Sequence, residues 1–365
     1  MYLDQSNTPK TQGNSNPLRA SVDWIVISAL VCALGALGVI SWHLQQKHSP
    51  PEELNSVAAY ENLARTQLHD GQLDAAQKTC ELAIKKNFDG VGIRHLLVQA
   101  MFVRGDQAGV KTQLAWGRGH ADAMLLHIDE ISIAISRGEL HRAEELLTGL
   151  RTRAYPPELA AQYQSALAAT ARALAEVGMV TASQDLLKSL PPETRDNNVA
   201  VALAEDGEVA RAEELLHALE QDHGQEAISK AERLPEIRAA LALAKHQPDQ
   251  ALQALEPNLK VAGSTFGPLY LRGEAYTILA NPPAAQTEYL KITDHRYADP
   301  LSNEYPLALL ASARAYVLQN QPDQAHAQFE RLLDLWRDAD ADWPLLQTVK
   351  KESDSDAALD VTLKP

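Results

Sequence analysis

The 365-residue sequence contains few cysteine, aromatic and basic residues. Its two cysteines, Cys32 and Cys80, lie in an apolar run and at a packed helical position, so a disulfide framework is excluded. Lysine and arginine number 33 against 48 aspartates and glutamates, which gives a net charge of -15. Affinity for nucleic acids comes largely from basic side chains on phosphates, so we expect no nucleic-acid binding.

Sequence motifs typical of enzymes and metal sites are also missing. The chain has no HExxH, CxxC, GxSxG, GxxxxGK[ST] or GxGxxG pattern, and its 12 histidines show no metal-ligand spacing. The adjacent carboxylates 144–145 and 213–214 point apart on a helix and make a poor acid–base pair. We predict no enzymatic activity, no cofactor and no bound metal; an enzyme built from the irregular loops is the remaining alternative.

Charge is absent from one long apolar run, which begins at Trp24 and ends at Trp42. Its length matches a bilayer core of about 30 Å, and tryptophans favour both membrane interfaces. The following residues SWHLQQ offer no small-x-small cleavage site, and Val31 stands where a lipoprotein has a small residue before its cysteine. We predict an uncleaved transmembrane helix over 24–42, with Trp24 and Trp42 as interface anchors in the lipid bilayer.

The flanking residues indicate orientation and linkers. Lys10 and Arg19 precede the run, and Lys47 is the first basic residue after it, which favours a cytoplasmic N-terminus. Residues 1–23 are polar and predict a disordered tail, and 43–55 contain Pro50 and Pro51, typical of a stiff linker. We expect a single-pass protein of the inner, cytoplasmic membrane whose larger part is periplasmic or otherwise extracytoplasmic.

Beyond the linker the sequence repeats itself. Residues 138–150 read GELHRAEELLTGL and residues 207–219 read GEVARAEELLHAL, with nine of thirteen letters unchanged. The offset of 69 is close to two units of about 34 residues, the period of tetratricopeptide (TPR) repeats. Such units cannot bury an apolar face alone and therefore stack into a solenoid.

Turn residues mark the individual units. Glycines recur at the expected turns, and the later turns read HQPDQA, ANPPAA and NQPDQA, where proline begins the second helix; the glycines are Gly71, Gly105, Gly138, Gly178 and Gly207. We predict an all-α, right-handed superhelical solenoid of about eight helix-turn-helix repeats over 56–337. A C-terminal cap and acidic tail over 338–365 complete the predicted domains.

Two loops are longer than the others, EPNLKVAGSTFGP from Glu256 and TDHRYADPLSNEYP from Thr293. Loops carry binding residues more often than helices do, so either could contact a partner. A plain insertion between helices is the alternative explanation.

A family resemblance rests on the last repeats. Residues 266–352, including LRGEAYTILANPPAAQTEYLKITDHR, resemble the closing repeats of bacterial membrane-anchored TPR proteins. The resemblance implies a single span followed by the array, with a serine/threonine kinase or winged-helix domain on the other side of the membrane. Only 23 residues precede this span, and no HRD or DFG triplet occurs, so we expect an array that stands alone.

The binding surface of such arrays is usually the concave face. Mapping the repeat positions onto this sequence predicts a polar groove suited to an extended peptide, formed by Arg65, Gln99, Arg172, Tyr270, Glu274 and Arg314. We expect a membrane-anchored scaffold or assembly factor that binds a protein partner. A sensory component whose output domain lies on another chain is the alternative.

Overall fold

The structure is a computed structural model that describes residues 54–222, 227–257 and 266–354. The chain divides into two units, 1–54 and 55–365, and the predicted membrane span lies outside the described residues. Within those residues no helix is both long and apolar enough to cross a bilayer. The described residues contain helices and no strand, so the all-α prediction is confirmed.

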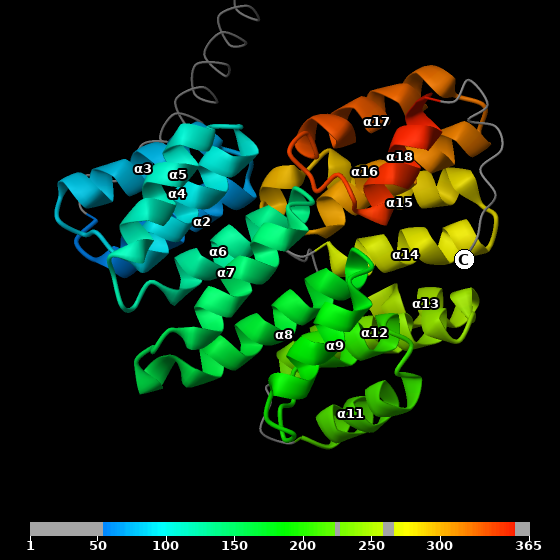
Figure 1. Cartoon of the computed structure of the whole chain (residues 1–365), viewed down its shortest axis with the longest axis horizontal. Coiled ribbons are helices and arrows are strands. Elements are labelled where there is room, and N and C mark those ends of the chain that lie inside the picture. The colour runs from blue at the N-terminus through cyan, green and yellow to red at the C-terminus, as the bar shows by residue number, and fades with distance from the viewer. Residues whose placement is uncertain (1–53, 223–226, 258–265, 355–365) are drawn as a thin grey trace, which may run out of the picture. The chain divides into compact units, whose positions relative to one another are not determined.

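Seventeen α-helices and two short 3-10 helices make up the described part of the second unit (Figure 1). They are α2 Val57–His69, α3 Leu73–Lys85, α4 Val91–Val103, α5 Gln107–Arg118, α6 Met124–Ser136, α7 Leu140–Thr152, η1 Pro157–Leu159, α8 Ala160–Glu176, α9 Val180–Ser189, α10 Asn197–Glu205, α11 Val209–Gln221, α12 Ala227–Ala244, α13 Pro248–Leu255, α14 Gly267–Ile278, α15 Pro282–Thr293, η3 Arg296–Ala298, α16 Glu304–Leu318, α17 Pro322–Leu335 and α18 Pro344–Asp354.

Consecutive helices pack against each other in eight pairs, from α2 with α3 to α16 with α17. The first helix of each pair also packs on the first helix of a neighbouring pair, for example α2 on α4 and α12 on α14. The described helices therefore form a stack of hairpins over the range in which the sequence predicted repeats.

The same backbone conformation and hydrogen-bond pattern occur in the turns of all eight hairpins. Each turn contains a residue in the left-handed region, and these are Gly71, Gly105, Gly138, Gly178, Gly207, His246, Ala280 and Asn320. In every turn the N–H of this residue donates to the carbonyl three residues earlier, and the next N–H donates to the carbonyl five residues earlier. This is the Schellman arrangement that satisfies the last carbonyls of a helix.

A small side chain follows each turn at a fixed distance. The residue five positions after the left-handed one is buried in every pair, and the eight are Ala76, Val110, Ala143, Ser183, Ala212, Ala251, Ala285 and Ala325. A small side chain there lets the second helix approach the first closely. Alanine and leucine supply much of the remaining core.

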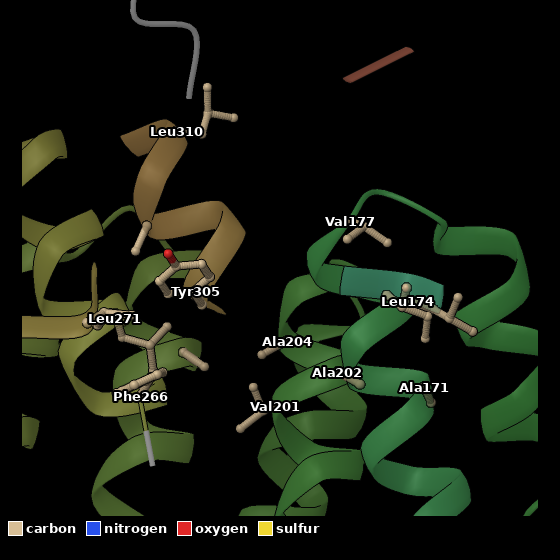
Figure 2. Close-up of a cluster of buried hydrophobic side chains, with 14 of the residues drawn as sticks. Ala171, Leu174, Val177, Val201, Ala202, Ala204, Phe266, Leu271, Tyr305 and Leu310 are labelled. Carbon is tan, nitrogen blue, oxygen red and sulfur yellow. The ribbon is translucent and has the colours of Figure 1, made fainter. Parts of the chain in front are cut away.

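The core is continuous from the middle of the array to its C-terminal end. One cluster of buried apolar side chains runs from Met124 in α6 to Val349 in α18. Figure 2 shows part of it, with Leu174 on α8 and Phe266 and Tyr305 near the starts of α14 and α16. These repeats therefore share one apolar interior.

The segment between α17 and α18 packs against turns near the middle of the array. The Trp336 Nε1–H donates to the Ser136 carbonyl at 3.1 Å, and the Trp343 Nε1–H donates to the Val177 carbonyl at 3.3 Å. Both rings are buried and contact each other edge to face, with centroids 4.6 Å apart. This segment is the closing loop, residues 336–343.

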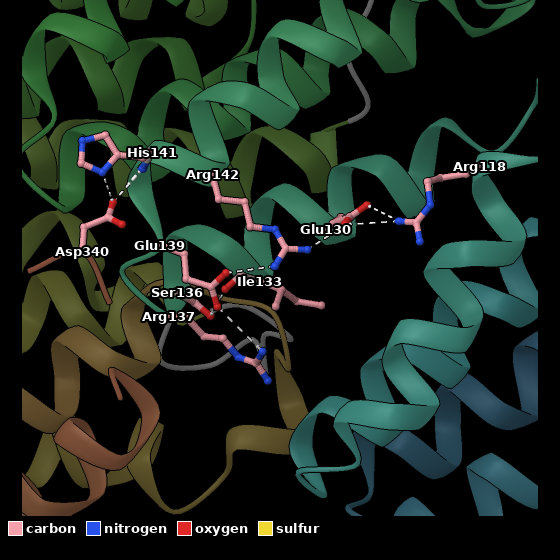
Figure 3. Close-up of polar contacts among 9 residues, drawn as sticks. All are labelled: Arg118, Glu130, Ile133, Ser136, Arg137, Glu139, His141, Arg142 and Asp340. Atoms are coloured by element: carbon pink, nitrogen blue, oxygen red, sulfur yellow. Dashed lines mark hydrogen bonds and ion pairs between the residues drawn. The ribbon is translucent and has the colours of Figure 1, made fainter. Parts of the chain in front are cut away.

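Asp340 adds a polar attachment to the same contact (Figure 3). Its backbone N–H donates to the Gly138 carbonyl at 2.9 Å, and its carboxylate accepts from the His141 backbone N–H at 2.7 Å. The His141 ring Nδ1 lies 2.9 Å from the same carboxylate. Residues about 200 positions apart in sequence therefore meet at the closing loop.

The loop after α15 makes a second long-range contact. Arg296 in η3 stacks on Phe102 of α4 and on Tyr305 of α16, with its guanidinium carbon 4.7 Å from each ring centroid. The Tyr297 ring lies against the Gly71 turn. The loop that the sequence assigned to a partner contact or a plain insertion therefore joins the C-terminal repeats to the first two pairs.

Candidate functional site

The contacts across the array leave a cavity of about 1000 Å³ among the first helices of the pairs, called here the central cavity. Its wall comes from α4, α6, α8, α10, α12, α14 and α15 and from residues 299–304. The wall is mixed, with Leu125, Ile128 and Leu301 beside amide and charged side chains. A cavity of this size and polarity can hold part of a peptide or a small molecule.

Arg172 of α8 is the electrostatic centre of this wall. Its Nε lies 2.8 Å from Glu176, its Nη1 2.9 Å from Glu236 and its Nη2 3.1 Å from Glu304. All four side chains are nearly buried. A buried arginine with three carboxylates has more negative than positive charge around it, which is costly unless protons or other cations compensate.

Burial and this excess of acidic groups raise the pKa values of neighbouring carboxyl groups. Burial, together with the charge of Glu304, raises the pKa of Glu176 to about 8. Burial and the same Glu304 also raise the pKa of Asp299 to about 8, although the Phe266 N–H donates to it. These carboxyl groups therefore hold protons at neutral pH for much of the time.

Glycine at position 267 is needed for this arrangement. A Cβ on Gly267 would lie 2.0 Å from Glu236 Oε1 and 2.6 Å from Arg172 Nη2. The start of α14 can therefore lie directly against the ion pair. A larger residue there would displace the charged groups.

Asn303 anchors the loop to the same wall. Its Nδ2 donates to the Ala173 carbonyl at 3.2 Å and lies 3.5 Å from Glu176 Oε2, while its Oδ1 accepts no hydrogen bond from the described residues. The side chain is only 6 % exposed. A buried acceptor without a donor is unusual in a folded protein.

A second polar group on the wall joins α4 to α6. His95 Nδ1 lies 2.8 Å from the buried Asp129 carboxylate, and the Gln99 amide lies 3.0 Å from His95 Nε2. Burial works against the charged imidazole, but Asp129 outweighs it and raises the pKa of His95. Both ring nitrogens have partners, so this group is held in place within the wall.

Glu205, Glu274 and Tyr270 extend the acidic region beyond the cavity lining. Glu205 interacts electrostatically with Glu176, Arg172 and Glu274. Burial raises the pKa of Glu274 to about 7. Within the described residues, the side chains of Glu205, Glu274 and Tyr270 form no hydrogen bond or ion pair, and the Tyr270 ring contacts that of Tyr289, with centroids 5.9 Å apart.

The predicted groove residues fall into two groups. Gln99 and Arg172 line the central cavity, and Tyr270 and Glu274 belong to the adjoining acidic region. Arg65 is exposed and acts electrostatically on His95, whereas Arg314 forms an ion pair with Glu352 at 2.9 Å. The structure therefore brings four of the six together, with Arg65 and Arg314 outside.

Several residues of this region were not predicted from the sequence: Glu205, Glu236, Asp299, Asn303 and Glu304. Asp299 and Asn303 belong to the loop from Thr293, whose length was the only signal. Glu236 follows Pro235 in the sequence, and Glu304 lies near the end of the same loop segment, at the start of α16. In sequence both resemble ordinary surface carboxylates. Within the described residues no group of three or more histidine, cysteine, aspartate or glutamate side chains is arranged to hold a metal ion.

Comparison with known proteins adds no identification, because no protein-family model matches this chain and no curated protein sequence is significantly similar to it.

Proposed function

We propose that the second unit is a TPR-type, right-handed solenoid that binds a segment of a partner protein in its central cavity, without catalysing a reaction on it. The observation that carries this proposal is the cavity itself, about 1000 Å³, formed by the first helices of successive pairs. The eight identical turns support the assignment to helix-turn-helix repeats.

The lining supports a peptide ligand. Gln99, Asn197 and Asn198 place amide groups on the wall, and amides can both donate to and accept from a peptide backbone. Apolar side chains such as Leu125 and Leu301 lie beside them and can contact side chains of the bound segment.

The membrane part of the proposal rests on the apolar run 24–42, which lies outside the described residues. We propose that it anchors the scaffold in the inner membrane with the repeats outside the cytoplasm. Alkaline phosphatase fused after residue 354 tests this, since the enzyme is active only where its disulfides form. An inactive fusion of a stably produced chain would contradict the orientation.

Photo-crosslinking in intact membranes tests the binding surface. A photoreactive amino acid at Gln99 or Asn198 of the full chain should give one defined adduct, since both residues line the cavity. The matched positions Lys111 on α5 and Glu214 on α11 are exposed and lie outside the cavity lining, and should give none. Adducts from the control positions alone, or from no position, would contradict the proposal.

A further inference from the structure

We propose that the acidic part of the central cavity binds a cationic group, an ammonium or guanidinium, carried by a basic side chain of the partner segment. This inference rests on the proposed function, because it specifies which residue of a bound segment the cavity selects. It is carried by the arrangement of charges, by unpartnered acceptors on the wall and by the space between them.

Carboxyl groups outnumber basic side chains around Arg172. Six carboxyl groups act on one another around this one guanidinium: Glu176, Glu205, Glu236, Glu274, Asp299 and Glu304. The nearby cations Arg272 and Lys291 are both paired with Glu288, at 3.3 and 2.7 Å. Arg233 is the one other lysine or arginine of the described lining and is exposed, and His95 is paired with Asp129. The acidic groups therefore outnumber the cations available to them.

The wall also offers acceptors that the protein does not use. Asn303 Oδ1 is buried without a hydrogen bond, and its amide is held against Ala173 and Glu176, two residues of the lining. Beside the cavity lining, Glu205 and Glu274 have no ion-pair partner among the described residues, and Glu205 is exposed. A cation that enters this acidic region meets these carboxyl groups without displacing an existing ion pair, and it reaches the buried Asn303 Oδ1 only if that side chain moves.

An organic cation fits this region better than a metal ion. The carboxyl groups come from five helices and one loop, and no set of three is arranged for coordination within the described residues. A cavity of about 1000 Å³ has room for an extended side chain with a flat or tetrahedral cationic end. Lysine and arginine side chains have that form.

Protons bound to these carboxyl groups neutralise part of the negative charge that a bound cation would otherwise neutralise. Burial raises the pKa of Glu176 and Asp299 to about 8 and that of Glu274 to about 7. The titratable groups that face them are Arg172, Glu236, Glu304 and Glu205, and burial also raises the pKa of Glu205. A bound cation favours the ionised carboxylates and so releases protons. Binding should therefore be tighter at pH 8 than at pH 6.

Fluorescence anisotropy on the full-length chain in detergent micelles tests the inference. Labelled pentapeptides with two alanines on each side of a central arginine, citrulline or glutamate serve as probes, because citrulline keeps the shape of arginine without its charge. We expect the arginine peptide to bind at least tenfold more tightly than the citrulline peptide. Equal binding of these two, preference for glutamate, or no binding of any cationic probe would overturn the inference.

Free spermidine distinguishes the source of the cation. Its ability to displace the arginine peptide would confirm a shared cation site. Binding of spermidine without binding of the arginine peptide would overturn the assignment to a partner side chain in favour of a small amine.

Variants locate the site. Glu205→Gln and Glu274→Gln should each weaken binding of the arginine peptide about tenfold, whereas Glu214→Gln, an exposed glutamate on α11, should leave it unchanged. Thermal melts check that each variant is folded. Unchanged binding in both variants of the adjoining acidic region would contradict this inference alone, whereas the absence of cross-links from Gln99 and Asn198 would contradict the proposed function.

Discussion

Gly138 shows how one residue can serve two purposes. It is left-handed, like the other turn glycines, and a Cβ there would lie 2.7 Å from the Trp343 ring and 2.8 Å from Ala339. Gly105 has nearly the same backbone angle, but a Cβ there would meet nothing within 4 Å. The sequence predicts the turn at both positions, and only the structure separates them.

Gly138→Ala and Gly105→Ala should therefore differ in stability. Both variants place a Cβ in the left-handed region, at a cost of about 1 kcal/mol. Gly138→Ala also forces the closing loop away and should lose a further 1–3 kcal/mol, roughly the cost of overpacking. Urea unfolding measures both, and equal losses would show that the closing loop does not pack on Gly138.

Arg172 is the residue on which the buried charges depend. Arg172→Gln removes the one cation in contact with Glu176, Glu236 and Glu304, so it should lower the free energy of unfolding by about 3–5 kcal/mol. Lys188→Gln removes an exposed pair with Asp185 and should change it by about 0.5 kcal/mol or less. Urea unfolding at pH 7 compares them, and similar small losses would contradict the central role of Arg172.

Among the elements, the helix hairpins were the most predictable part of this fold. Local sequence sets their turns, since glycine tolerates the left-handed backbone and proline starts the next helix. The last three turns use His246, Ala280 and Asn320 at the left-handed position, each the first residue of the segments HQPDQA, ANPPAA and NQPDQA that the sequence assigned to turns. Asn281, which follows Ala280, accepts from the Ala284 N–H as the cap of α15.

Ala280 is a site where this local chemistry can be improved. Its φ of 52° is unfavourable for alanine, so Ala280→Gly should raise the free energy of unfolding by about 0.5–1 kcal/mol. Ala58→Gly, at an exposed position inside α2, should lower it by about 1 kcal/mol. Thermal unfolding gives both values, and a loss of stability in Ala280→Gly would show that the turn is not left-handed.

The candidate site was predictable only in part, because some of its residues follow from the local repeat pattern and others meet only through long-range packing. Gln99 and Arg172 follow from repeat positions on the first helices, because the period fixes which side chains face the concave side. Glu236 and Glu304 come from other pairs, and Asp299 and Asn303 come from a loop, so their meeting with Arg172 depends on how the whole array curves. No local pattern in the sequence carries that information.

The whole molecule should be most stable in mildly acidic solution. Glu176, Asp299 and Glu274 have folded pKa values of about 8, 8 and 7, above the ordinary values of 4.5, 3.8 and 4.5. Between these limits the folded state binds more protons than the unfolded state, so the free energy of unfolding falls as the pH rises. The melting temperature should drop by about 5–10 °C from pH 5.5 to 8.5.

Glu274→Gln is the control for that dependence. The glutamine does not titrate, so the drop in melting temperature should be smaller in this variant than in the parent chain. A melting temperature that stays constant or rises with pH in the parent chain would mean that the carboxyl groups around Arg172 are ionised in the folded state.

Closure of the array is the central feature of the whole molecule. The loop over 293–304 completes the cavity wall, and the closing loop, which is not part of that wall, packs on the turns after α6 and α8. The ring of His141 on α7 lies 3.6 Å from the Asp342 carboxylate in the closing loop, and both side chains are exposed. Cysteines at these two positions, in a chain with Cys32 and Cys80 changed to alanine, can be joined by a short bis-maleimide.

The rate of that intramolecular cross-link is the most direct measurement. We predict rapid joining of the His141→Cys/Asp342→Cys pair in the native protein, none in either single variant, and a large loss of rate in urea. Slow joining of the pair in the native protein, no faster than in urea, would show that the closing loop does not dock on the turn after α6 and that the array is open there.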